Sequence, residues 1–430
     1  MTGTSVLPEV FTSLATTRPA RAGTAALRAA LHARRMLLLK SLLVRVDQQS
    51  RLLSLTVRRR FEEDWALLVR AEQADTRAAR DVLDYPLTGA WLVETLATPT
   101  GATLDRHLAH LGGVALAAAV RAGCGVGGTL PVPSGALALP GLGVLRCPSG
   151  AVRISGGAGL VHLGDTQGHS SVVLQSPAAR PASGVSRGVG SGPGWSALRT
   201  LPGTTVVLDD LDPYRVPPLG IGPRALRATE RPDCPRRLWA RRWSEAHELL
   251  AGIDPERAAE TGAVLRAVVP LATAVPRGAA PVGATLRAAP GAALAQLPAQ
   301  PWELAETLVH ETHHTKLAVL DELVPLCRTG GLTTHRVGWR HDPRPVPAVL
   351  QGAYAHLALT DLWWRVRNEP AAPPAWRHRA DERFEVFRDD VGQALSLLRE
   401  SDELTSPGRE FVHEMGRHHA GLGVATHCGR

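Results

Sequence analysis

LVHETHHTKLAVLDELVPL, residues 308–326, predicts the central helix of the C-terminal part of the chain. Leucine and valine flank a polar centre, and no proline interrupts the run before Pro325. His310 and His314 are four residues apart, so on a helix their imidazole rings point the same way, one turn apart. Two rings in this arrangement can bind one divalent ion, with Glu311 beside it. The stretch therefore predicts a metal site on a helix.

A catalytic ion needs a third protein ligand as well as open positions. The longer peptidase pattern HExxHxxGxxH is absent, because leucine stands at positions 317 and 320 where that pattern has glycine and histidine. Asp321 lies about 10 Å beyond His314 at 1.5 Å per residue. The next segments offer three histidines. His356 lies on an otherwise apolar helical segment and is our first choice, and the alternatives are His335 and His341 in a proline-rich loop.

The whole chain divides by sequence character into three parts. Residues 1–122 carry apolar residues at helical spacing and form an N-terminal helical region. Residues 123–235 are rich in Gly, Pro, Ser and Val, with short apolar runs that predict strands between turns. Residues 236–430 return to helical patterning and contain the metal-binding, catalytic region. The predicted fold is mainly α with a β-containing middle region (α+β), and the metal site lies between helices of the C-terminal third.

Composition excludes several classes of protein. The net charge is +8, but only two of the 48 basic residues are lysines and the arginine runs are short, so we expect no nucleic-acid partner. We expect no membrane span or signal peptide, and a cytoplasmic location. The five cysteines include no CxxC pair, which argues against a zinc knuckle or a redox motif. The run of Asp209, Asp210 and Asp212 before a proline is typical of a structural turn. Composition leaves the oligomeric state unknown.

Several stretches together resemble one family, the actinobacterial HExxH-motif proteins of gene clusters for ribosomally made peptides, including the FxSxx-type systems. They are LRAALHARRMLLLKSLL, VLDYPLTGAW, LGGVALAAAVRAG, GALALPGLG, VVLDDLDPYR, AETLVHETHHTKLAVLDELVPL, WRHDPRP and LQGAYAHLAL. They cover nearly the whole chain in the family's order. Residues 283–287 (GATLR) depart from the Ser-Ala-Thr-Ser-Arg-like run that is common in the family, and the loop near 180–195 looks expanded.

The resemblance implies a 2-oxoglutarate-dependent peptide β-hydroxylase that contains Fe(II) and acts on a ribosomally synthesised precursor peptide. It implies a facial ligand set of His310, His314 and a third group such as His356. Arg340 or Arg344 would bind the far carboxylate of 2-oxoglutarate. Glu311 would then lie next to the metal or contact it.

Two other functions stay open. A zinc metallopeptidase would use the same motif with Glu311 as general base. A non-catalytic peptide-binding scaffold with a vestigial metal site would need none of these residues for chemistry.

Overall fold

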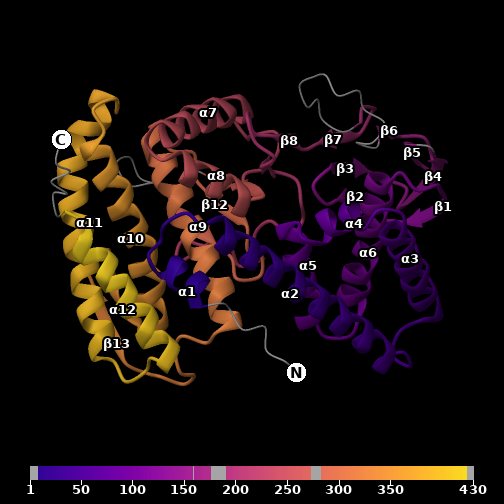
Figure 1. Ribbon diagram of the computed structural model, residues 1–430. Helices are drawn as coiled ribbons and strands as arrows, with labels where there is room; N and C mark the ends of the chain where they lie inside the picture. The colour runs from indigo at the N-terminus through magenta and orange to yellow at the C-terminus, as the bar shows by residue number, and fades with distance from the viewer. Residues whose placement is uncertain (1–7, 158, 176–189, 273–281, 424–430) are drawn as a thin grey trace. The chain divides into compact units, whose positions relative to one another are not determined.

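The computed structural model describes residues 8–157, 159–175, 190–272 and 282–423 (Figure 1). The chain forms two compact units. Unit 1 comprises residues 1–30, 237–265 and 280–430, and unit 2 comprises residues 31–236 and 266–279. Most of the predicted loop near 180–195 lies outside the described residues. The three parts predicted above remain a division by sequence character, whereas the units are defined by contacts.

The helices of unit 2 pack through their apolar faces. α6 is buried along most of its length and lies against α3 and α4. Gly123 ends α6 in the left-handed conformation (φ 71°), which glycine adopts without a steric penalty. The helices are α2 (Arg21–Gln48, whose first residues belong to unit 1), α3 (Leu55–Ala74), α4 (Thr76–Leu83), α5 (Pro86–Ala97) and α6 (Ala102–Ala122).

Short strands make up the rest of unit 2. β1, β4, β5 and β6 form an antiparallel sheet in that order, and β2, β3 and β7 form a second sheet. β9 pairs with β8 and, in parallel, with β10. The strands are β1 (Val126–Pro131), β2 (Ala136–Leu139), β3 (Gly143–Arg146), β4 (Ala151–Gly157), β5 (Leu160–Asp165), β6 (Ser171–Gln175), β7 (Trp195–Ala197), β8 (Arg199–Thr200), β9 (Val207–Leu208) and β10 (Ala267–Pro270).

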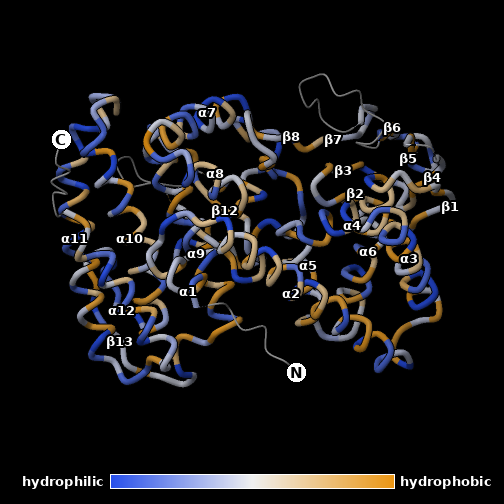
Figure 2. The backbone as a smooth tube through the Cα atoms, viewed as in Figure 1, coloured by the Kyte–Doolittle hydropathy of each residue, from blue (hydrophilic) through white to orange (hydrophobic). Residues whose placement is uncertain are grey.

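Unit 1 is a helical assembly with two short strand pairs. α10 contacts α9, α11 and α12, and α8 contacts α9 (Figure 1). In Figure 2, α11 and α12 carry both hydrophilic and hydrophobic bands, as amphipathic helices do. The elements are α1 (Pro8–Ala15), α7 (Arg236–Ile253), α8 (Pro255–Val264), β11 (Gly283–Thr285), β12 (Ala292–Ala295), α9 (Pro301–Leu323), β13 (Thr334–Val337), β14 (Arg340–Pro345), α10 (Val346–Asn368), α11 (Pro374–Glu400) and α12 (Ser406–Gly421).

The predicted fold class is confirmed, since helices predominate and strands concentrate in the middle of the chain. One local prediction was wrong. The predicted proline-rich loop that contains His335 and His341 is the β-hairpin β13–β14. The sequence analysis also did not predict the strands β11 and β12. None of the helices in the described ranges is long and apolar enough to cross a membrane.

Candidate metal centre

The HExxH motif lies in the middle of α9, as predicted. Two features favour the start of this helix. Pro301 occupies its first turn, where a missing N–H breaks no helical hydrogen bond. The Gln300 N–H donates to Glu303 Oε2 at 2.9 Å. α9 packs on α10, which is buried along most of its length and carries His356. The packing of these two helices brings together side chains that are more than forty residues apart in the sequence.

His310, His314 and His356 form one cluster. The ring centroids of His310 and His314 are 4.4 Å apart, and those of His310 and His356 are 5.1 Å apart. His356 is 8% exposed, whereas His310 and His314 are half-buried. Burial lowers the pKa of all three rings, that of His356 to about 4, and holds them in the neutral form that binds metal.

Hydrogen bonds orient two of the three rings. His356 Nδ1 donates to the Gly352 carbonyl at 2.8 Å, and His314 Nδ1 donates to Gln351 Oε1 at 3.0 Å. With Nδ1 engaged in this way, Nε2 of each ring keeps its lone pair for a ligand. The sequence analysis did not identify Gln351, which lies on α10 five residues before His356.

These rings line a pocket with a volume of about 610 Å³ within unit 1. All six predicted site residues contribute to its lining, and His335 and His341 do not. The lining also includes Thr285, Trp339 and Gln351. The structure therefore brings all six residues to one pocket. His356 lies beside the pair of His310 and His314, whereas His335 and His341 do not line this pocket.

Arg340 and Arg344 enter the pocket from β14. Both guanidiniums bind Asp342, at 3.0 Å from Arg340 Nε and 3.1 Å from Arg344 Nη1. Asp342 is exposed, and this shared pairing lowers its pKa. Exposed ion pairs of this kind contribute little to stability, so a ligand carboxylate can displace Asp342 at small cost.

Glu311 is 2% exposed and lies under β11. Thr285 Oγ1 donates to Glu311 Oε2 at 2.5 Å. Burial raises the pKa of Glu311 to about 7, and the Thr285 hydrogen bond opposes part of that rise. The carboxyl group is thus held at the edge of the metal pocket and can exist in either protonation state near neutral pH.

Trp339 is a site residue that the sequence analysis did not identify. Its ring stacks on His356 with centroids 4.4 Å apart and planes 17° from parallel. A Cβ on Gly352 would lie 2.7 Å from Trp339 Nε1, so the indole occupies the space that this glycine leaves. In the sequence, the one indication that a large side chain packs here was Gly352, four residues before His356. Trp339 lies between β13 and β14, so the hairpin positions it over α10.

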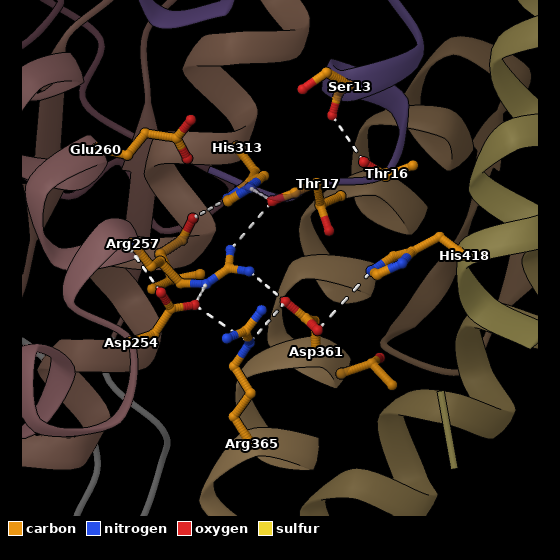
Figure 3. Close-up of polar contacts among 12 residues, drawn as sticks. Ser13, Thr16, Thr17, Asp254, Arg257, Glu260, His313, Asp361, Arg365 and His418 are labelled. Atoms are coloured by element: carbon orange, nitrogen blue, oxygen red, sulfur yellow. Dashed lines mark hydrogen bonds and ion pairs between the residues drawn. The ribbon is translucent and has the colours of Figure 1, made fainter. Parts of the chain in front are cut away.

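The opposite face of α9 contacts a buried ionic network (Figure 3). A ring N–H of His313 donates to a backbone carbonyl, with Nδ1 2.8 Å from the Val309 oxygen and Nε2 3.3 Å from the Thr17 oxygen. Lys316 Nζ lies 2.9 Å from both oxygens of Glu260. Figure 3 shows Arg257 beside the carboxylates of Asp254, which precedes α8, and Asp361 on α10. α9 therefore separates a pocket of neutral imidazoles from a cluster of paired charges.

One histidine of the C-terminal helix α12, His418, belongs to this second cluster. His418 is 7% exposed and lies 4.0 Å from Asp361 Oδ1, and burial lowers its pKa to about 4. It does not line the metal pocket. The acidic run in unit 2 is also structural, because Asp209 accepts from Tyr85 and Asp210 pairs with Arg231.

Within the described ranges, no three His, Cys, Asp or Glu side chains already stand in the positions of ligands to one ion. The donor chemistry nevertheless fits a divalent transition metal, since three neutral imidazoles line one pocket and two of them keep Nε2 unengaged. Comparison with models of known protein families and with curated proteins finds no match. The family resemblance therefore stays a prediction.

Proposed function

We propose that the protein is an Fe(II)- and 2-oxoglutarate-dependent oxygenase that hydroxylates a β-carbon in a ribosomally synthesised precursor peptide. The observation that carries the proposal is the common pocket of His310, His314 and His356 with the two hairpin arginines. Imidazole alone suits iron, zinc and copper alike. A guanidinium beside such a ligand set adds a site for a carboxylate cosubstrate.

In this proposal the chain positions the reactants. His310, His314 and His356 would hold the iron on one side and leave the pocket side open. Bound iron and 2-oxoglutarate would supply the oxidation, in which dioxygen is consumed and a C–H bond becomes C–OH while 2-oxoglutarate becomes succinate and carbon dioxide.

The surrounding residues have supporting roles. Gln351 holds the ring plane of His314, and Trp339 covers one face of His356. Arg340 or Arg344 would exchange Asp342 for the far carboxylate of 2-oxoglutarate through a two-pronged hydrogen bond. Glu311, bonded to Thr285, would stay beside the ligands as a hydrogen-bonding neighbour.

The test needs no peptide. Metal-free protein is mixed anaerobically with Fe(II) and then with 2-oxoglutarate, and its visible spectrum is recorded. A weak charge-transfer band is expected that disappears in His310→Ala and His356→Ala. His341→Ala is the matched control, because His341 lies on β14 with Arg340 and Arg344 but does not itself line the pocket. Absence of a band in the unmodified protein, together with tight zinc binding, would refute the proposal.

A zinc peptidase is the second candidate, and Glu311 is the observation that favours it. A carboxyl group with a pKa of about 7 at the edge of a histidine cluster suits a general base. We rank this function second because Glu311 is 2% exposed and already engaged by Thr285. Peptide cleavage by the zinc-loaded protein that is abolished in Glu311→Gln would reverse the ranking, whereas the oxygenase predicts that this variant keeps the charge-transfer band.

A further inference from the structure

β11 presents an unpaired backbone edge. It pairs antiparallel with β12 on one side, and the described strands include none on its other side. The Gln296 N–H donates to the Val282 carbonyl, so residues 282 and 296 form a hydrogen-bonded pair. Because such pairs alternate along an antiparallel ladder, Ala284 also bonds to β12, whereas the N–H and C=O of Gly283 and Thr285 point away from it. Two residues thus offer backbone donors and acceptors at the free edge.

This edge lies next to the histidine cluster. Gly283, Ala284 and Thr285 line the same pocket as His310 and His314. The face of β11 that carries the Thr285 side chain packs on α9, because Thr285 Oγ1 bonds to Glu311. A Cβ on Gly283 would lie 2.7 Å from Glu311 Oε1, so glycine allows the strand to approach α9 closely. An extended chain beside β11 would therefore pass the metal ligands.

Positive charge surrounds the same opening. Arg287 follows β11 by two residues, lines the pocket and has a side chain 72% exposed. Its nearest carboxylate is Asp321 at 3.6 Å, and Arg340 and Arg344 share the one carboxylate of Asp342. Three guanidiniums thus face two exposed carboxylates, and Glu311, the third carboxyl group at this pocket, is buried with its pKa raised to about 7, so positive charge remains in excess beside the free edge.

From these observations we infer that an extended, acidic segment of the substrate peptide binds as an additional strand along β11, with an Asp or Glu side chain at Arg287. The inference rests on the proposed function, because it places the peptide against the ligands of that site. Backbone hydrogen bonds to Gly283 and Thr285 would supply affinity that does not depend on the side chains of the peptide. The acidic residue would supply selectivity. Side chains of alternate peptide residues would point toward His310 and His314.

The experiment uses a display library of random linear dodecapeptides as its probe. Peptides are selected anaerobically on the full-length protein loaded with Fe(II) and 2-oxoglutarate, and the charge-transfer band is recorded in the same sample. Enriched peptides should contain an excess of Asp and Glu. The tightest binder is then resynthesised with one N-methyl group at each successive position. Methylation should weaken binding by about tenfold or more at every second residue over the bound segment, since each loses one hydrogen bond.

Two protein variants test the charge. Arg287→Glu should weaken the selected peptide by about tenfold or more, through loss of one ion pair and gain of a repulsion. Arg328→Glu is the matched control, because Arg328 is exposed in the same unit and does not line the pocket, and it should change affinity little. Both variants should keep the charge-transfer band.

Failure to enrich any peptide, no excess of acidic residues, or an N-methyl scan without a period of two would overturn the inference. If the band persists in that case, the proposed function stands and only the binding mode is wrong. If the band is absent from the start, the proposed function fails first.

Discussion

The buried pair Lys316–Glu260 offers a test of how α9 is held in place. Lys316 Nζ lies 2.9 Å from both carboxylate oxygens, and the two side chains are 0% and 3% exposed. Burial lowers the pKa of Lys316, and Glu260 opposes that shift. Removing one partner leaves the other charge buried and unpaired, which costs about 3–5 kcal/mol. Lys316→Met and Glu260→Met should therefore each destabilise unit 1 by about this amount.

The double variant distinguishes pairing from packing. Two independent losses would sum to about 6–10 kcal/mol. Methionine keeps much of the volume of both side chains and suits a helix, and an apolar replacement of a whole buried pair is often neutral or stabilising. Lys316→Met/Glu260→Met should therefore be more stable than either single variant.

Urea and thermal midpoints, followed by circular dichroism, measure these differences. Arg417→Met serves as a control, because Arg417 pairs with Glu414 at the surface and its loss should cost less than about 1 kcal/mol. A double variant as unstable as the sum of the single variants would refute the reasoning. So would a Lys316→Met variant with an unchanged midpoint.

Three further predictions concern other parts of the molecule. Gly352→Ala should displace Trp339 and lower the free energy of unfolding by about 1–3 kcal/mol through overpacking, although alanine favours helix. Calorimetry measures the loss of stability and tryptophan fluorescence the displacement, and a rise in melting temperature would contradict the prediction. Burial lowers the pKa of His418 from 6.5 to about 4, so the stability contributed by its neutral form is present above pH 6.5 and falls by about 3 kcal/mol as the pH drops toward 4. The free energy of unfolding between pH 7 and pH 4 should therefore depend less on pH in His418→Gln. Equal pH curves for the two proteins would exclude this cause. Tyr85→Phe removes the hydroxyl that donates to buried Asp209 in unit 2 and should cost about 1–3 kcal/mol in urea unfolding without changing the charge-transfer band.

The sequence predicts the site well where the signal is local. The four-residue spacing in α9 and its apolar flanks depend on nothing outside that helix. His356 required an additional chemical argument, namely that a histidine pair with no third ligand needs one from a neighbouring segment. Its place beside His310 follows from helix packing, which the spacing alone does not determine.

The short strands were missed for a physical reason. β11 and β12 consist of Gly, Ala, Leu and Thr and show no alternation of apolar and polar residues, because β12 is buried on both faces. β13 and β14 are mostly polar, and β14 contains two prolines, so their sequence is typical of a loop and does not reveal the pairing. Strand pairing is a contact between segments, and it is therefore weakly encoded in either segment alone.

The sequence did not predict the buried ionic network, because helical periodicity assigns charged residues to the solvent-facing side of a helix. Lys316 follows the motif on an apolar helix and is one of only two lysines in the chain, which was a weak signal. Its partner lies on α8, 56 residues earlier in the sequence. Nothing in the local pattern connects the two.

The network also explains how the pocket is positioned. α8 bonds to α10 through Arg257 and Asp361 (Figure 3). It bonds to α9 through Glu260 and Lys316, so one short helix contacts both ligand-bearing helices. Sliding α9 along α10 by one helical turn would break at least one of these bonds and leave a buried charge unpaired. Besides the packing of α9 on α10, these two ion pairs therefore favour one relative position of the HExxH pair and His356. A buried ion pair adds little net stability, whereas a buried charge without its partner is costly, so the two pairs disfavour other registers of α9 on α10.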